Sequence, residues 1–398
     1  MAPSRRNEKP VAVTPPAQAP TPVAEIVAEE ETQALGRVEV SKPTPWTPSK
    51  RGWIARRVVT ALLALIVIGS PALVGNIENL RAISLAMIYV IVGLSINILM
   101  GYAGQISLGH QAFVGVGAFT AALVVTKASA PFFVALLLAG VIGAISAFLL
   151  GIVALRLKGL YLALITLAYG AVAEFTIFAT PAITGGGAGV NAVRPSFLVS
   201  ERSFVYFSML MVAVALYIDW RLVRSKVGRA IFAIRENELA AASFGINVTS
   251  YKLVAFVISG IFAGVAGALF GFRVESVDAA NFDFALGLTF VLMAVVGGLG
   301  SRIGVFIGSA FFALLDLLIH SLFGTGFGHW LVDKVPFLGQ LELYPGFIGA
   351  VLLLMTLTLY PGGIAQQIKP LTGWLGGKRL KDHGHGVTIR EGGAGVRP

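Results

Sequence analysis

The sequence predicts an all-α protein that crosses a membrane many times, and three observations support this fold class. Of the 398 residues, 56% are hydrophobic and only 13% are charged, a balance that soluble domains do not show. Apolar runs of about 20 residues, the length that crosses a hydrocarbon core of about 30 Å as a helix, recur along most of the chain. The 47 glycines fit the same class, because small residues allow membrane helices to approach closely.

Composition divides the chain into three parts. Residues 1–50 hold nine of the 18 prolines and are predicted to be a disordered tail, since such a segment cannot bury a core. Residues 51–365 contain the apolar runs and form the transmembrane domain. Residues 366–398 form a second polar tail, rich in glycine, in which His383 and His385 are too few for a closed metal site.

We expect about ten membrane-spanning helices, one for each apolar run of sufficient length. They cover about residues 58–75, 80–100, 108–126, 131–155, 160–179, 204–220, 251–272, 284–299, 303–323 and 345–361. The run at 284–299 is short for a full crossing, and we expect it to tilt or to re-enter the membrane.

Charge sets the orientation of these helices. Arg51, Arg56 and Arg57 precede the first run, which places the N-terminus in the cytoplasm under the positive-inside rule. An even number of crossings returns the C-terminus to the cytoplasm as well. The basic groups that this parity places inside are Arg156, Lys158, Arg221, Arg224, Lys226, Arg229, Arg235, Arg302, Lys369, Lys378, Arg379 and Lys381. Topology therefore accounts for the net charge of +10, and we expect no nucleic-acid partner.

The residue types also exclude several kinds of chemistry. The chain contains no cysteine, which excludes disulfides, thiol catalysis and thiolate metal sites. The sequence shows no Ser/His/Asp arrangement and no cluster of metal ligands. We therefore expect no catalytic residue, no metal and no cofactor.

The stretch GYAGQISLGHQAFVGVGAF, residues 101–119, interrupts the apolar region with glycines and polar residues. Residues 80–126 span 47 positions, about 70 Å as helix, which is two crossings and not one. The break therefore joins two helices on the cytoplasmic side or dips into the protein interior. Either it lines a solute path, or its glycines only allow close packing. The candidate path residues in the break are Gly101, Gly104, Gln105, Ser107 and Gly109, whereas we expect His110 to be packed and hydrogen-bonded.

The longest polar interruption is RLVRSKVGRAIFAIRENELAAASFGINV, residues 221–248, in a loop of about 221–250. Its residue content favours helix, and Gly245 is a predicted helix stop. A short helix with a charged face at the membrane surface indicates docking to a cytosolic partner. An amphipathic linker in the headgroup region is the alternative.

These motifs resemble those of the LivM/LivH-type permeases, the membrane subunits of bacterial ABC importers for branched-chain amino acids and related small solutes. Besides the two stretches above, ITGGGAGV (183–190) and VLMAVVGGLGSRIGVFIGSA (291–310) match in order and spacing. The resemblance covers about residues 57–365 and is closest to the LivM-type half. Departures are Val305, where the family usually has proline, Val190, where leucine is usual, and a longer N-terminal tail.

The resemblance implies a permease subunit in the bacterial inner membrane that forms part of the path for branched-chain amino acids, or for another amino acid, an amide or urea. It implies three kinds of partner: a second homologous permease, cytosolic ABC ATPase subunits and an extracytoplasmic solute-binding protein. Since the sequence has no G-x-x-x-x-G-K-[ST] phosphate loop, ATP hydrolysis is expected on a separate subunit.

In this picture, residues 51–365 are the permease domain and loop 221–250 docks the ATPase. The ATPase-docking candidates are Arg229, Arg235, Glu236, Asn237, Glu238, Ala241 and Gly245. On the outside, Thr184, Gly185 and Gly186 either meet a solute carboxylate through backbone N–H groups or form a flexible turn. Arg194, Glu201 and Arg202 are either docking residues for the binding protein or, as we prefer, ordinary surface charges.

A stand-alone secondary transporter or channel for a small solute is the alternative function. Such a protein needs ionisable groups inside the membrane, and Glu174 and Asp316 are carboxylates within apolar runs. They lack a third acid or a basic partner within the same helix turns, so we favour structural hydrogen bonding over a proton relay.

Overall fold

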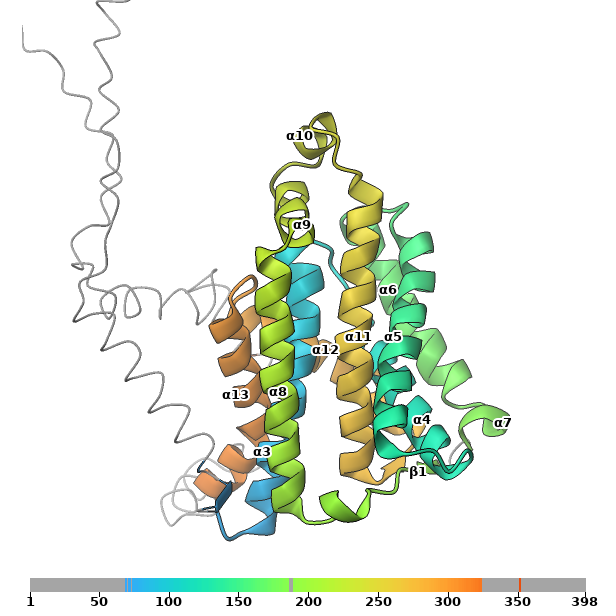
Figure 1. Cartoon of the computed structure of the whole chain (residues 1–398), viewed down its shortest axis with the longest axis vertical. Coiled ribbons are helices and arrows are strands. Elements are labelled where there is room, and N and C mark those ends of the chain that lie inside the picture. The colour runs from blue at the N-terminus through green and yellow to red at the C-terminus, as the bar shows by residue number, and fades with distance from the viewer. Residues whose placement is uncertain (1–68, 70, 73, 186–188, 324–350, 352–398) are drawn as a thin grey trace, which may run out of the picture.

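The computed structural model describes residues 69, 71–72, 74–185, 189–323 and 351. Within these residues the protein is predominantly helical, and most of its long helices run along one common direction (Figure 1). The main helices of the first half are Ile77–Ile96 (α3), continued by the π-helical turn Asn97–Tyr102 (η1), His110–Thr126 (α4), Phe132–Ala154 (α5) and Leu160–Val172 (α6), continued by the π-turn Ala173–Ile177 (η2). Those of the second half are Glu201–Arg224 (α8), Val248–Val274 (α11), Phe284–Gly297 (α12) and Arg302–Phe323 (α13).

Each of the eight predicted spans between residues 80 and 323 coincides with a helix. In the part of the chain that the structure describes, six helices are long and apolar enough to cross a membrane, judged by length and composition: Ile77–Tyr102, Phe132–Ala154, Leu160–Ile177, Glu201–Arg224, Val248–Val274 and Ala279–Gly297. Two more apolar helices, His110–Thr126 and Arg302–Leu315, are shorter. The predicted spans 58–75 and 345–361 lie largely outside the described residues, as do both predicted tails.

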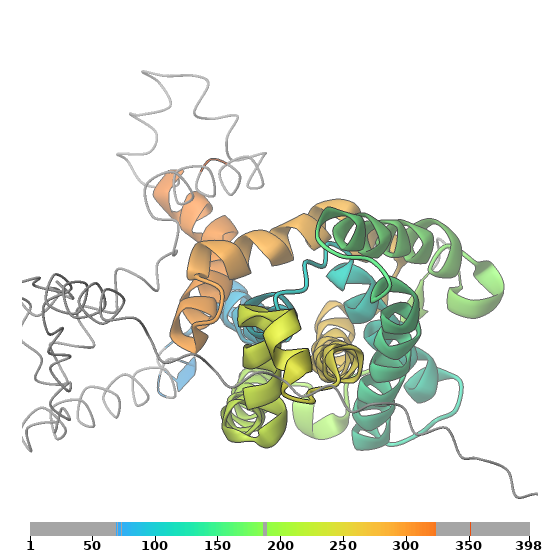
Figure 2. The same ribbon diagram turned by 90° about the horizontal axis from the view of Figure 1, so that it is seen from above.

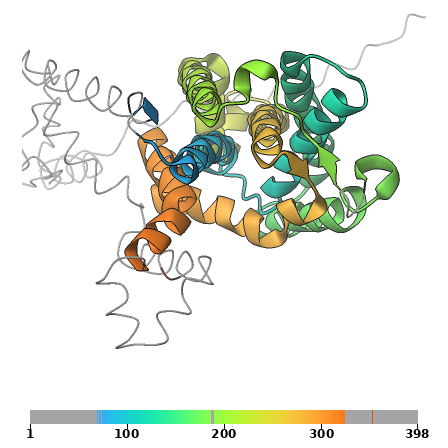
Figure 3. The same ribbon diagram turned by 90° about the horizontal axis from the view of Figure 1, so that it is seen from below.

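Helix α11 is the central element of the bundle. Views along the helix axes show α5 and α6 on one side of it and α3 with α13 on the other (Figures 2 and 3). Glycines allow its close contact with α4 and α5: a Cβ at Gly117 would lie 2.1 Å from the Gly264 carbonyl oxygen, and one at Gly143 would lie 2.4 Å from that of Gly260. Helix backbones therefore touch directly, as membrane helices with small residues do.

One end of the bundle, which we call the loop end, carries the short helices Lys226–Glu236 (α9) and Glu238–Ser243 (α10) (Figure 1). Asn237 forms the corner between them, because its N–H donates to the Ala233 carbonyl at 3.1 Å and its side chain accepts from the Ala240 N–H at 3.0 Å. Gly245, the predicted helix stop, follows α10 with φ +80, a left-handed conformation that favours glycine. The N–H groups of Gly245 and Ile246 donate back to α10 carbonyls, which closes the helix.

The opposite end, which we call the ribbon end, carries a two-stranded antiparallel ribbon of Val190–Asn191 (β1) and Ser276–Val277 (β2), with Val190 opposite Val277. Three short helices complete this end: Pro181–Thr184 (α7), Ser196–Leu198 (η4) and Ala279–Phe282 (η5). Phe282 of η5 packs against Phe119 of α4 and against Phe178, with the three ring centroids 5.0–5.9 Å apart, so this aromatic cluster joins η5 to α4.

Candidate functional site

The glycine-rich break dips into the protein interior. After η1 ends at Tyr102, the chain runs without helix to His110, where α4 begins beside the middle of α11. The His110 ring anchors this point, with Nδ1 3.0 Å from Ser107 Oγ and Nε2 3.1 Å from Ser259 Oγ. Ser95 of α3 donates to the Ser259 carbonyl at 2.8 Å. A buried polar network thus holds irregular backbone between helices, the setting in which such backbone is tolerated at membrane depth.

The candidate glycines of the break differ in what they do. A Cβ at Gly101 would lie 2.7 Å from the Gly300 backbone nitrogen, and one at Gly109 would lie 2.0 Å from the Thr166 carbonyl oxygen. Both glycines are therefore required by close packing. Gly104 is exposed and has φ +66, a left-handed backbone conformation that favours glycine at this position.

The polar candidates of the break turn inward. Ser107 is fully buried in the His110 network, and the Gln105 amide donates to the Ala103 carbonyl at 3.0 Å. The exposed members of the segment are Gly104 and Ile106, the latter with 42% of its surface accessible. Sequence reasoning missed Ile106, although alternation along extended chain is the signal that identifies it.

Two further polar positions at the loop end were missed from the sequence. Asn97, in the π-turn η1, accepts the Gly300 N–H at 2.7 Å and so ties η1 to the turn between α12 and α13. Asp219 of α8 is fully buried, accepts from the Tyr102 hydroxyl at 3.2 Å and forms an ion pair with Arg302 Nε. Both are polar residues within or at the end of an apolar run, which is the signal available in the sequence.

Most docking candidates in the loop are engaged within the chain. Arg235 donates from Nη1 to the Gly101 carbonyl, and Ala241 is buried against the bundle. Glu238 pairs with Lys252 and, at 3.0 Å, with Lys158. The hydrogen bond from Lys252 holds the pKa of Glu238 below its ordinary value. With Asn237 and Gly245 shaping the ends of α10, these residues fix the position of that helix.

The exposed part of the loop is partly apolar. Arg229 and Glu236 are exposed, as predicted for a charged face, and the Arg229 guanidinium donates to the Arg224 carbonyl at 3.0 Å. Two large apolar side chains that the sequence reasoning did not select are the most exposed: Leu239 at 84% and Phe244 at 86%. Two large apolar side chains at the loop end therefore face away from the rest of the described chain.

At the ribbon end, Thr184 and Gly185 form the end of α7 and the turn that follows it. The Thr184 hydroxyl donates to the Phe178 carbonyl at 2.6 Å and is buried. Gly185 ends α7 with φ +77, and a Cβ there would lie 2.6 Å from the Gly189 carbonyl oxygen. Gly186 lies outside the described residues. Thr184 and Gly185 therefore form part of a turn at the end of α7.

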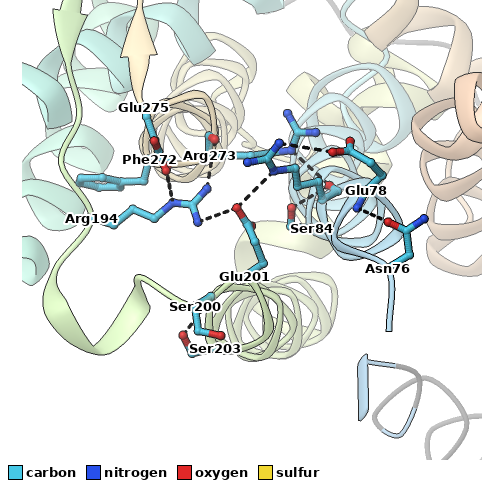
Figure 4. Close-up of polar contacts among 11 residues, drawn as sticks. Asn76, Glu78, Ser84, Arg194, Ser200, Glu201, Ser203, Phe272, Arg273 and Glu275 are labelled. Atoms are coloured by element: carbon cyan, nitrogen blue, oxygen red, sulfur yellow. Dashed lines mark hydrogen bonds and ion pairs between the residues drawn. The ribbon is translucent and has the colours of Figure 1, made fainter. Parts of the chain in front are cut away.

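The charges proposed for binding-protein docking are mostly buried, contrary to their expected place on the surface. Arg194 donates to the Phe272 and Arg273 carbonyls at 2.7 and 3.1 Å, and its Nη1 lies 3.1 Å from Glu201 Oε1 (Figure 4). Glu201 also pairs with Arg81 at 3.3 Å. These contacts join α3, α8 and α11 at the ribbon end. Because the segment that connects Arg194 with Glu201 passes the ends of α3, α8 and α11, the two side chains bind to these helices and do not face solvent. Only Arg202 of the three candidates is exposed.

Comparison with known proteins places the chain in a family. The family described as branched-chain amino acid transport system, permease component, matches residues 79–356. The high-affinity branched-chain amino acid transport system permease protein LivM of Salmonella typhimurium is 32% identical over 284 residues, 64% of this chain and 67% of that protein. LivM of Escherichia coli is 32% identical over 303 residues, 69% of this chain and 71% of that protein.

A more distant relative has a different named solute. The galactose/methyl galactoside import permease protein MglC of Salmonella typhimurium is 25% identical over 291 residues, covering 68% of this chain and 84% of that protein. The match to the first family spans most of the helical bundle and both of the segments described above, the glycine-rich break and the loop with α9 and α10. This chain belongs to the family of permease components of branched-chain amino acid transport systems.

Proposed function

We propose that this chain is the membrane-spanning permease subunit of an ATP-driven importer that carries branched-chain amino acids inward. The observation that carries the proposal is the family match over residues 79–356, supported by LivM relatives that are 32% identical. The chain itself supplies a transport path and no catalytic residue. The alternative substrate is another amino acid, an amide or urea. Relatives of this chain differ in their named solutes, since one at 25% identity is named for galactose and methyl galactoside.

In this proposal the loop end faces the cytoplasm of a bacterial cell and the ribbon end faces outward. The basic residues of α9 and its flanks favour this orientation under the positive-inside rule. The domain of residues 51–365 then has ten crossings, with the tails 1–50 and 366–398 both in the cytoplasm. The six apolar spans support placement in the inner membrane.

Helix α10 is the proposed contact with a cytosolic ABC ATPase subunit. Leu239 projects from it and Phe244 from the residue after its end, while Glu238 and Ala241 hold it against the bundle. A rigid support with exposed apolar side chains suits the transmission of force, because ATPase closure must move the permease helices as bodies. Of the candidates inferred from sequence, Arg229 and Glu236 belong to the exposed contact, and Arg235, Asn237, Glu238, Ala241 and Gly245 belong to its support.

The solute path is proposed to pass the glycine-rich break at its exposed residues, Gly104 and Ile106. Gly101 and Gly109 shape the break by packing, and Gln105 and Ser107 hold it from within. A second homologous permease would complete the path from the other side. An extracytoplasmic binding protein would deliver the solute at the ribbon end, where Arg202 and Gly185 are exposed.

The proposal is tested by co-purifying this chain with the second permease and the ATPases and measuring uptake of radiolabelled L-leucine into proteoliposomes with the binding protein present. Uptake that requires ATP and every subunit is the expected result. A stand-alone secondary transporter, the competing function, would need intramembrane acids for energy coupling. Glu174, in η2, is one acid within an apolar span. The side chain of the other, Asp316, lies outside the described part of the structure.

A further inference from the structure

Gln111, in the first turn of α4, is the starting point. Its side chain is 1% exposed, yet neither its amide oxygen nor its amide nitrogen has a hydrogen-bond partner among the described residues. Buried amides are rarely left in this state, because they lose hydrogen bonds to water and gain none in return. A conformation in which Gln111 is paired is therefore favoured on hydrogen-bonding grounds.

The amide is enclosed by two glycines on neighbouring helices. A Cβ at Gly170 of α6 would lie 2.5 Å from Gln111 Nε2, and a Cβ at Gly287 of α12 would lie 2.3 Å from Gln111 Oε1. Helices α6 and α12 thus present bare backbone to both polar ends of one side chain. The two helices lie next to each other in both axial views (Figures 2 and 3).

The amino end of α4 adds positive potential at this place. Gly109 is its N-cap residue and provides no side-chain hydrogen bond, so the partial positive charge of the helix dipole is uncapped by a side chain. Because the break dips inward, this end lies among α6, α11 and α12 and away from the surface. Helix ends of this kind bind anionic groups of solutes in other transporters.

Negative charge lies one helical turn away on the same two helices. Glu174 in η2 has a buried Oε2 without a hydrogen-bond partner among the described residues. Its carboxylate lies within electrostatic range of Asp283, the N-cap residue of α12. Asp283 caps α12 by accepting the Leu286 N–H at 2.8 Å. We call Gly170, Glu174, Asp283 and Gly287, with Gln111 between them, the seam.

We propose that the seam is a binding site for the zwitterionic head group of an amino acid. Gln111 and the amino end of α4 bind the carboxylate, and Glu174, with Asp283 beside it, binds the ammonium group. Gly170, which borders Gln111, lies four residues before Glu174, about 6 Å along a helix, a separation on the scale of an amino-acid head group with a hydrogen bond at each end. The inference rests on the proposed function, since it assigns a solute site within an importer.

The seam is closed in this structure, because the backbones of Gly170 and Gly287 flank the amide closely. Separation of α6 from α12 during the transport cycle opens it. Leu160, Tyr161 and Val172 of α6 and Phe175 of η2 are exposed, so one face of this segment is not packed against the rest of the described chain. The solute then supplies the hydrogen bonds that Gln111 lacks when the seam is closed.

The test uses the whole importer in proteoliposomes, with L-leucine uptake and ATP hydrolysis measured on the same sample. Gln111→Met keeps side-chain length and removes the amide, and Glu174→Gln keeps shape and removes the charge. Ser208→Ala and Glu78→Gln are the matched controls: Ser208 is a buried hydroxyl bonded within its own helix, and Glu78 is an exposed acid paired with Arg81 at 3.5 Å.

Both seam variants are expected to lower leucine transported per ATP hydrolysed at least tenfold, with ATP hydrolysis and subunit assembly within twofold of wild type. The controls are expected to keep the wild-type ratio. An unchanged ratio in both seam variants, or a joint loss of uptake, ATP hydrolysis and assembly, overturns the seam while the importer function stands. Absence of ATP-dependent leucine uptake in the wild-type complex instead overturns the proposed function and the seam with it.

A labelling experiment tests the opening directly, because the chain has no cysteine of its own. The Gln111→Cys variant of the importer is expected to react with a water-soluble thiol reagent during ATP turnover and to be protected by L-leucine. The control Ala112→Cys, at a neighbouring position that is 0% exposed, is expected to stay unreactive. No reaction of Gln111→Cys during turnover, in a variant that still assembles and hydrolyses ATP, contradicts the proposal.

Discussion

Arg235 in α9 donates a hydrogen bond from its guanidinium to the backbone carbonyl of Gly101 in η1. The same side chain borders the break, since a Cβ at Gly104 would lie 3.3 Å from Arg235 Cγ. It also borders the turn between α12 and α13, where a Cβ at Gly300 would lie 3.4 Å from Arg235 Nη1. A single residue of the loop thus contacts both the glycine-rich break and the turn between α12 and α13.

Replacement of Arg235 by methionine is expected to reduce transport without reducing ATPase binding. The variant loses a charge-assisted hydrogen bond to a carbonyl, which costs about 1–2 kcal/mol of unfolding free energy. Leucine uptake by the reconstituted complex should fall at least tenfold while ATPase subunits still co-purify, because Arg235 points toward the bundle. The matched control is Arg156→Met, which removes an exposed arginine after α5 that is not part of the proposed ATPase contact. Equal uptake by the two variants would disprove this role of Arg235.

The exposed apolar residues of α10 are expected to control ATPase association. Leu239→Asp and Phe244→Asp should each weaken binding of the ATPase at least tenfold in a pull-down titration, because each places a charge in an apolar contact. Since the two side chains are 84% and 86% exposed, the stability of the chain should change by no more than about 0.5 kcal/mol. Ser243→Asp adds the same charge on the same helix without removing apolar surface. If it weakens binding as much as the other two, apolar contact is not the cause.

Acid pH is expected to weaken the support of α10. The pKa of Glu238 is lowered, first by the hydrogen bond from Lys252, so the ionised carboxylate is favoured in the folded state. Its contribution to stability is therefore fully present above the ordinary value of 4.5 and is lost as pH falls through the lower, folded-state pKa. The melting temperature of wild type should exceed that of Glu238→Gln by a constant margin from neutral pH down to about pH 5.

Below that point the margin should shrink and then disappear. Glu236→Gln is the control, because Glu236 forms no ion pair with any described residue. A wild-type advantage over Glu238→Gln that is the same at pH 3 and pH 7 would show that the pairs with Lys252 and Lys158 do not stabilise α10.

The break should tolerate substitution differently at each glycine. Gly109→Ala places a Cβ 2.0 Å from the Thr166 carbonyl oxygen, so α4 and α6 must separate, at a cost of about 1–3 kcal/mol of unfolding free energy. Gly75→Ala meets no atom within 4 Å and should leave the melting temperature unchanged. Thermal unfolding of both variants in detergent measures the difference. Equal melting temperatures would mean that Gly109 is not held by contact with α6.

Much of the bundle could be predicted from the sequence, because apolar length is the dominant constraint on membrane helices. The runs at 131–155 and 251–272 agree closely with α5, Phe132–Ala154, and α11, Val248–Val274. The run at 108–126 was expected to be a full crossing, but α4 has 17 residues and begins at His110. The sequence showed the glycine-rich break beside it, but the depth of the break depends on Ser95 and Ser259, which lie on two other helices.

The candidate site was predictable in outline and not in detail. Composition identified the loop and its helix stop at Gly245, since both are local features. Whether a charged residue of the loop faces solvent or the bundle depends on tertiary contacts, and this is why Arg235 and Glu238 turned inward. For the same reason Arg194 and Glu201, which look like surface charges in sequence, instead form buried ion pairs and hydrogen bonds that connect the ends of three helices.

The central claim is that solute movement through this chain is driven by ATP hydrolysis on a partner subunit. The most direct measurement compares L-leucine uptake into proteoliposomes that contain this chain with the second permease, the binding protein and either active ATPases or hydrolysis-deficient ATPases, at fixed proton and sodium gradients. We predict uptake only with the active ATPases, at a rate that does not change when the gradients are collapsed. Gradient-driven uptake at the same rate with the hydrolysis-deficient ATPases, or with this chain alone, would contradict the claim.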